Sequence, residues 1–310
     1  MYLPFLAPLA FLILCLGFFK APPPWRARLT ALALAALFVV AAHVMSVPLK
    51  LPPKDALDSL LLVSVLLALY VVFFPQVDET HYSPRIFYVA AVGLLLLWHI
   101  RHDVWTMGQA RNLIAFFCLG LGTWSILNSG FHKVGAYALV TLPLMATAAL
   151  SYILSLSGGV LLSRMVLLLA LFILVAVPLA GRGRISLPGL IPFMSVFLAA
   201  FAAVGFFYSN ISPWRLIAAF IPFLLILLRS WLPLPRGPVL EALALNVLAA
   251  IPLGYVIWQL QSPQASRLAL ATRSCPTHQT LFLGANPSRI MALPQARNTI
   301  SLSDAVNSCF

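Results

Sequence analysis

The chain has 310 residues, of which 62% are hydrophobic and only 8% are charged, and its mean hydropathy is +1.00. A soluble domain needs about a quarter of its residues charged, and a disordered chain contains far fewer apolar residues, so both classes are excluded. The formal net charge is +12. Because the basic residues stand singly or in pairs between apolar runs, we attribute this charge to membrane topology and lipid headgroups rather than to nucleic acid.

About ten segments are long and apolar enough, or nearly so, to cross a bilayer as helices of about 20 residues. In chain order we expect helices at 2–19, 29–47, 59–75, 86–100, 112–129, 134–157, 160–180, 189–208, 216–232 and 239–261. Proline and glycine residues separate most of them. The apolar runs are continuous rather than alternating, which excludes barrel strands. The sequence therefore predicts an all-α, polytopic membrane helix bundle of about ten transmembrane helices.

The first segment, 2–19, is followed rather than preceded by basic residues, the reverse of a signal peptide, so we expect a membrane helix with its N-terminus outside. The inner loops then hold nine basic residues: Lys20, Arg26, Arg28, Arg85, Lys133, Arg182, Arg184, Arg229 and Arg236. The outer helix ends hold six, so the bias follows the rule that basic residues stay on the cytoplasmic side. We expect a bacterial inner (plasma) membrane protein.

Two domains are expected, a transmembrane bundle at 1–261 and a small soluble C-terminal tail at 262–310. An even number of helices places this tail outside, like the N-terminus. An oxidising compartment would allow Cys275 and Cys309 to form a disulfide. This disulfide would stabilise the tail, which is too small to form a convincing hydrophobic core of its own.

One group of polar residues lies on the predicted outer face, at the end of the fourth helix. His99 is followed by His102 and Asp103 at helical spacing, and a histidine beside a carboxylate can act as a base. We predict these three as catalytic residues. The phosphate-binding residues that we predict are Arg101, Arg111 and His43. The alternative interpretation is an interfacial belt of Trp, His and Arg.

A second candidate cluster, on the predicted inner face, contains Asp78, Glu79, His81 and His132. These residues could bind a cation or a headgroup, or they could form an ordinary solvated loop. We predict no metal site, because His99 and His102 lack a clear third ligand. No cofactor is identified, since no histidines face each other at mid-depth.

Three functions remain open for this chain. It has no phosphate loop, dinucleotide fingerprint, HExxH, G-x-S-x-G or CxxC motif, so nucleotide hydrolysis, dehydrogenation and zinc proteolysis have no support. The first function is a transferase acting at the outer face on a lipid-linked phosphate or saccharide. The second is a permease or flippase, and the third is a non-catalytic subunit that anchors other protein subunits of a membrane complex. The expected partners are membrane lipids, with no nucleic acid.

Overall fold

The structure is a computed structural model that describes residues 4, 6–49, 53, 55–74, 85–86, 88–93, 107–130, 134–183, 185–209, 211–232 and 237–261. The chain divides into two compact units, Met1–Ile257 and Trp258–Phe310. The predicted tail, including Cys275 and Cys309, lies outside the described residues, so the disulfide and the domain boundary at 261 stay predictions. All that follows concerns the first unit and the whole of its last helix.

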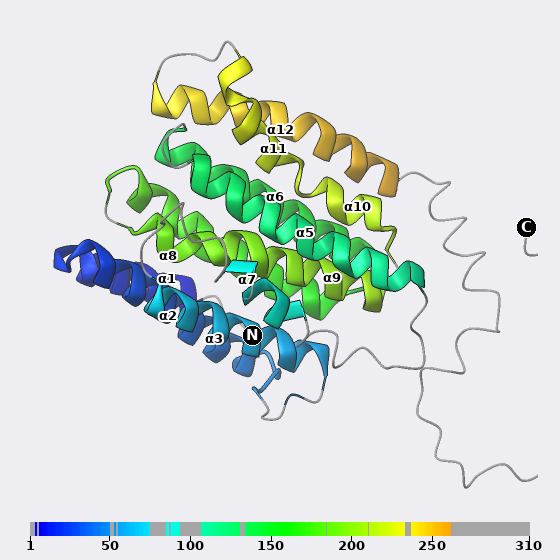
Figure 1. Cartoon of the computed structure of the whole chain (residues 1–310), viewed down its shortest axis with the longest axis horizontal. Helices are drawn as coiled ribbons and strands as arrows, with labels where there is room; N and C mark the ends of the chain where they lie inside the picture. The colour runs from blue at the N-terminus through cyan, green and yellow to red at the C-terminus, as the bar shows by residue number, and fades with distance from the viewer. Residues whose placement is uncertain are drawn as a thin grey trace, which may run out of the picture. The chain divides into compact units, whose positions relative to one another are not determined.

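The described chain is helical throughout, apart from turns and short connections (Figure 1). The bounds of the elements are α1 (Leu6–Gly17), η2 (Phe18–Lys20), α2 (Pro23–Val44), α3 (Ala56–Phe73), α5 (Met107–Gly130), α6 (Ala136–Leu156), α7 (Val160–Ala180), α8 (Leu187–Pro192), η4 (Phe193–Phe197), α9 (Leu198–Ser209), α10 (Pro213–Ala218), α11 (Ile221–Leu228), η5 (Arg229–Trp231) and α12 (Pro238–Gln261). Residues 85–86 and 88–93 are helical as well. The predicted all-α fold is confirmed for this part of the chain.

Six stretches within the described residues are long and apolar enough to cross a membrane: Pro23–Val44, Ala56–Phe73, Ala136–Leu156, Val160–Ala180, Leu187–Phe207 and Pro238–Gln261. Two further apolar helices, Leu6–Lys20 and Ile114–Gly130, are shorter. These helices indicate a multi-pass membrane protein, whereas the predicted number of about ten spans is not established.

The predicted span at 216–232 is broken into two short helices, α10 and α11. Pro222 lies in the first turn of α11. Since proline has no backbone N–H, it cannot donate to the carbonyl of Ala218, four residues earlier. The chain turns at Ala219 and Phe220 instead, so neither half is long enough to cross a bilayer alone.

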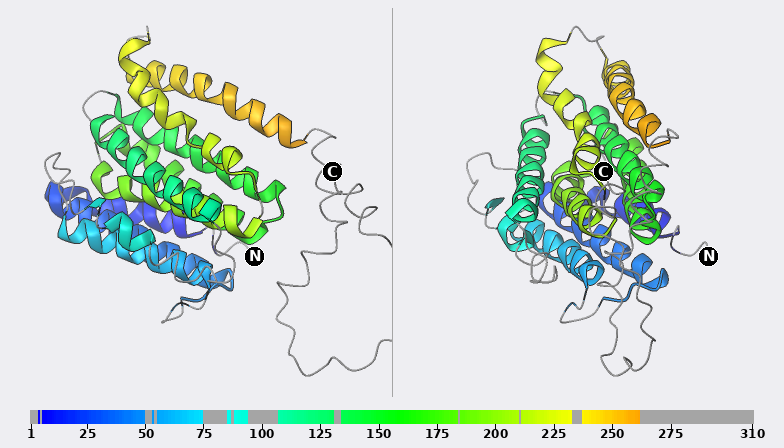
Figure 2. Two further views of the ribbon diagram at one scale, coloured as in Figure 1. Left: turned by 45° about the vertical axis from the view of Figure 1, so that its right-hand side comes forward. Right: turned by 90° about the vertical axis from the view of Figure 1, so that its right-hand side faces the viewer.

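The chain from α8 to α9 forms the centre of the bundle. Its apolar window is 89% buried, against 28% for that of α12, which lies at one edge in Figure 2. Aromatic rings line this central helix, and Phe38 of α2 meets Phe197 edge-on at 5.1 Å between centroids. The central helix is irregular, because Pro192 breaks the hydrogen-bond ladder and the π-helical turn η4 follows at once.

Close backbone approach fixes the start of the central helix against α2. A Cβ atom added to Gly189 would lie 2.7 Å from the carbonyl oxygen of Ala27, so only glycine fits this contact. On the other side of the bundle, Ser151 and Ser163 each donate to the other's carbonyl, over 2.9 and 2.8 Å, and join α6 to α7. Such polar contacts between small residues are typical of membrane helix pairs.

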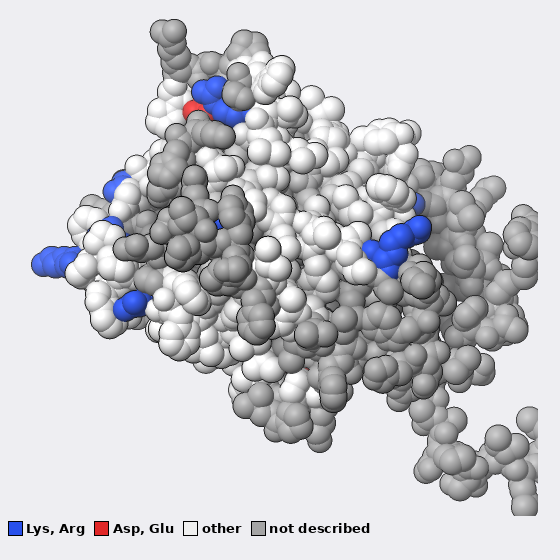
Figure 3. Space-filling model, viewed as in Figure 1, with Lys and Arg blue, Asp and Glu red and all other residues white. Residues whose placement is uncertain are grey.

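Two contacts bring several helix ends together at one end of the bundle. Arg26, at the start of α2, donates to the carbonyl of Gly183 in the α7–α8 connection. Arg229, after α11, pairs with Glu241 at the start of α12. This end, called the basic end below, carries Lys20, Arg26, Arg28, Arg85, Arg182 and Arg229. Figure 3 shows the described Lys and Arg side chains mainly towards two opposite edges, with uncharged residues between them.

Candidate anion-binding site

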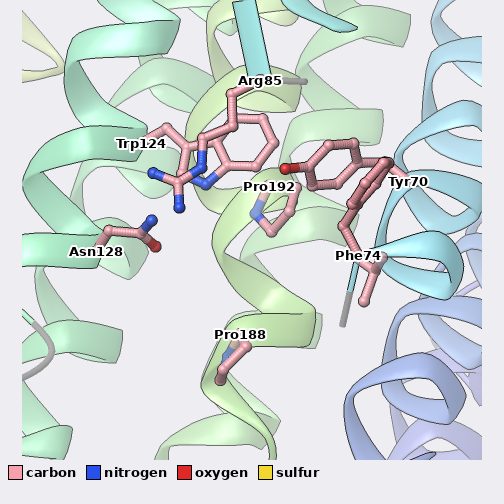
Figure 4. Close-up of a pocket in the computed structure, with 8 residues that line it drawn as sticks. Tyr70, Phe74, Arg85, Trp124, Asn128, Pro188 and Pro192 are labelled. Atoms are coloured by element: carbon pink, nitrogen blue, oxygen red, sulfur yellow. The ribbon is translucent and has the colours of Figure 1, made fainter. Parts of the chain in front are cut away.

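Arg85 is a buried cation inside the basic end, with only 6% of its surface exposed. It stands at the start of the helical residues 85–86 and faces Asn128 of α5 (Figure 4). The Asn128 side chain satisfies its neighbours when its amide oxygen faces the guanidinium, which then donates from Nη1 over 2.7 Å and from Nη2 over 2.8 Å. A charged donor pair on one amide oxygen holds the guanidinium in a defined orientation.

Aromatic rings surround the arginine on its other sides. The Arg85 Cζ atom lies 5.9 Å from the ring centroid of Trp124, within the range of a cation–π contact. Tyr70 of α3 meets Trp124 edge-on, with centroids 5.1 Å apart, and also contacts the rings of Phe74 and Tyr88. These rings partly replace the water that the cation has lost, and they leave little freedom for the guanidinium to move.

A small pocket opens beside the arginine, and four parts of the chain line it (Figure 4). Its lining residues are Tyr70, Val71, Phe74, Arg85, Trp124, Asn128, Pro188 and Pro192. The cavity volume is about 20 Å³, which is room for one water molecule. Two helices, the Arg85 segment and the irregular start of the central helix therefore converge on one charged group.

The backbone hydrogen-bond ladder of the central helix is interrupted where the helix borders this pocket. Pro192 cannot donate to the carbonyl of Pro188, and both prolines line the pocket. The hydroxyl of Ser195 donates to the carbonyl of Ile191 over 2.7 Å, which satisfies an acceptor within the disturbed ladder. Proline kinks and π turns in long helices are recurrent at functional sites and at bends.

The chemistry of this arrangement is recognition of an anion. A guanidinium carries five N–H donors and stays charged at any physiological pH. Its planar fork matches the oxygens of a phosphate or carboxylate group better than an ammonium does. Within the part of the chain that the structure describes, no group of three or more His, Cys, Asp or Glu residues is placed to hold a metal ion.

The structure places only two of the predicted outer-face residues. His43 is exposed in the last turn of α2, and Arg111 is exposed in the first part of α5. Both lie at the end opposite Arg85, so neither belongs to the pocket. His99, Arg101, His102 and Asp103 lie outside the described residues, as do the second-cluster residues Asp78, Glu79, His81 and His132. Both candidate clusters therefore stay predictions.

The sequence indicates Arg85 only as one of nine inner-loop charges. One signal could have singled it out: Trp124 and Asn128 are four residues apart, so they share a helix face within the mainly apolar part of α5, Ile114–Gly130. The amide of Asn128 and the indole of Trp124 need a polar partner. The buried cation that meets them is Arg85, in the helical segment that precedes α5. Comparison of the chain with protein families, with characterised proteins and with solved structures finds no match.

Proposed function

We propose that this chain is a carrier in the membrane plane, of the permease or flippase class, that moves a phosphate-bearing, lipid-linked compound. The observation that carries the proposal is the buried Arg85 beside the kinked central helix. An ionisable group inside a membrane bundle is costly and marks a substrate or ion pathway by default. Substrate sites of carriers also gather where a membrane helix is irregular.

The depth of the pocket favours a lipid phosphate as its ligand. Asn128 lies two residues before the end of α5, and Tyr70 lies three residues before the end of α3. At 1.5 Å per residue, the pocket lies roughly 3–5 Å inside the helix ends. Lipid phosphates occupy this level of a bilayer, just outside its hydrocarbon core. A headgroup could therefore reach Arg85 while its chains stay among the helices.

Movement of the central helix would be required to admit such a headgroup. The pocket has room for one water molecule, and a phosphate group with its four oxygens is several times larger. Pro192 and the π turn lower the cost of bending the central helix, because the ladder of hydrogen bonds is already interrupted there. Gly189 stays fixed on α2, so we expect the bend to separate the helix start from the part that follows.

The orientation of the carrier follows from its charges. Of the described basic residues, Lys20, Arg26, Arg28, Arg85, Arg182 and Arg229 lie at the basic end, and Arg111, Arg164 and Arg215 lie at the opposite end. The rule for cytoplasmic loops assigns the basic end to the cytoplasm. The N-terminus and the tail would then face outward from a bacterial inner membrane, and substrate would enter from the cytoplasmic side.

A transferase acting at the outer face is the second candidate. What favours it is that the exposed Arg111 and His43 share the end predicted to face outward, where Arg101, His99, His102 and Asp103 are also expected. This proposal requires that His99→Ala or Asp103→Asn abolish transfer while the protein still inserts. Normal transfer in both variants would contradict the assignment of His99 and Asp103 as catalytic residues.

Transbilayer movement of a labelled lipid tests the carrier directly. The full-length protein would be reconstituted into vesicles that contain fluorescent phosphatidic acid or, as the neutral-headgroup control, fluorescent phosphatidylcholine, and dithionite would report the fraction left on the inner leaflet. We expect movement of phosphatidic acid, reduced about tenfold or more in Arg85→Gln, because a lost charge-assisted hydrogen bond costs about 1.5–3 kcal/mol.

The matched control for this assay is Arg164→Gln, which changes an exposed arginine at the opposite end of the bundle. It should leave the movement unchanged. Glutamine keeps a donor for Asn128, so Arg85→Gln separates loss of charge from loss of folding. Equal movement of both lipids, or an unchanged rate in a folded Arg85→Gln variant, would contradict the proposal.

A further inference from the structure

An apolar stripe runs along the outward face of α2. Trp25 is 55% exposed, Leu32 is 42% exposed and Val40 is 57% exposed. Ala36 is exposed as well, and the spacing of seven, four and four residues keeps all four on one helix face. The stripe is therefore accessible to a lipid chain along most of a membrane-spanning helix.

A cation stands at the basic end of this stripe. The Arg28 Cζ atom lies 5.0 Å from the ring centroid of Trp25, one helical turn away. Its Nε atom is buried and has no hydrogen-bond partner among the described residues. A buried guanidinium nitrogen without an acceptor is a cost that an anionic ligand would remove.

Arg26, two residues earlier, has a different role. It donates to the carbonyls of Phe19 over 2.9 Å, Ala21 over 3.1 Å and Gly183 over 3.2 Å. These bonds tie the α1–α2 turn to the α7–α8 connection, and they bring the exposed Lys20 and Arg182 to the same end. Arg26 is thus structural, although its Nε atom also has no partner among the described residues. The position of Arg28 beside Trp25 is what makes it the cation at the head of the stripe.

Among the described residues of the basic end, the one carboxylate is that of Glu241, and it pairs with Arg229. The sequence contains no Asp or Glu in residues 1–54 or in residues 104–240, which include α1, α2, α7 and the α7–α8 connection. The described charges around Arg28 are therefore mainly positive, and they favour an anionic ligand. Arginine beside an exposed tryptophan at the end of an apolar face is the composition of a headgroup-level anchor.

From these observations we propose that α2 holds one anionic phospholipid, with its phosphate on Arg28 and Trp25 and one acyl chain along Leu32, Ala36 and Val40. The occupant is a lipid rather than a soluble anion, because Arg28 lies at the end of an apolar stripe. A hydrocarbon chain would cover this stripe, and a soluble anion would not. This site is separate from the Arg85 pocket, and the inference does not depend on the proposed carrier function.

Native mass spectrometry of the full-length protein tests the site. The protein would be purified in mild detergent and titrated with phosphatidylglycerol or phosphatidylcholine. We expect preferential retention of one phosphatidylglycerol, with affinity reduced about fivefold in Arg28→Gln, the effect of one basic residue near an anionic lipid. Arg164→Gln at the opposite end should keep the preference.

A fluorescence measurement locates the lipid independently. In vesicles with brominated phosphatidylglycerol, quenching of tryptophan should fall in Trp25→Phe more than in Trp214→Phe, which removes an exposed tryptophan near the opposite end. Equal retention of the two lipids, an unchanged preference in Arg28→Gln, or displacement of the lipid by excess inorganic phosphate would overturn the proposal.

Discussion

Removing the Asn128 oxygen, which accepts from Arg85, is predicted to destabilise the bundle more than removing a neutral polar contact between helices. In Asn128→Leu the guanidinium stays buried but loses the oxygen that accepts its Nη1 and Nη2 donors over 2.7 and 2.8 Å. Hydrogen bonds to charged groups contribute about 1.5–3 kcal/mol each. Because both bonds share one acceptor, we expect a loss of about 2–4 kcal/mol in the free energy of unfolding.

The matched control is Asn246→Leu. Asn246 donates to the hydroxyl of Thr141 over 2.8 Å, also between helices, but neither partner is charged. Such neutral bonds between membrane helices contribute about 0.6 kcal/mol on average. The Oδ1 atom of Asn246 is buried and has no hydrogen-bond partner among the residues that the structure describes, so leucine also removes an unfavourable group. The control variant should therefore cost clearly less than Asn128→Leu.

Equilibrium unfolding in mixed micelles of detergent and dodecyl sulfate, followed by circular dichroism, measures both losses. The double variant Arg85→Leu with Asn128→Leu should cost less than the sum of its single variants, since removing the charge also removes the need for an acceptor. The reasoning is refuted if Asn128→Leu costs no more than Asn246→Leu, or if the double variant is additive.

Three further predictions can be checked by thermal unfolding in one detergent. Gly189→Ala should lose about 1–3 kcal/mol, because its Cβ would meet the carbonyl of Ala27 at 2.7 Å; an unchanged melting temperature would contradict the contact. Gly122→Ala, which has nothing within 4 Å, should gain about 0.5–1 kcal/mol from helix propensity, and a loss would show a hidden neighbour. Glu241→Gln should lose about 1–3 kcal/mol, since Arg229 keeps partial access to solvent at 29% exposure; Arg229→Gln with Glu241→Gln should restore part of it.

Helix positions followed from the sequence wherever local chemistry decides them. The predicted helix at 160–180 matches α7 (Val160–Ala180), because glycines lie immediately before and after it. The predicted start at residue 29 was too late, since α2 begins at Pro23. Proline fits the first turn of a helix, where its missing N–H would have no partner in any case, so the run of prolines marks a beginning rather than a break.

The candidate site could not be predicted from local patterns, because its parts are distant in sequence. Tyr70, Arg85, Asn128 and Pro192 come from four segments, and only the packing of α3, α5 and α8 brings them together. A single basic residue after a proline resembles any topogenic charge. The two candidate clusters that we predicted consist mainly of polar residues that follow one another closely in the chain. Loops show this property as well as active sites.

Mass spectrometry of what stays bound after purification from native membranes is the most direct test of the central claim. The claim is that Arg85 binds a phosphate-bearing, lipid-linked compound. In mild detergent, the wild-type protein should retain such a compound in addition to the phospholipid on Arg28. Arg28→Gln should lose only that phospholipid, and Arg85→Gln should lose only the compound in the pocket. Equal retention of the pocket compound by Arg85→Gln would contradict the claim. A stoichiometric protein partner with no bound lipid phosphate would contradict it as well and would favour an anchoring subunit.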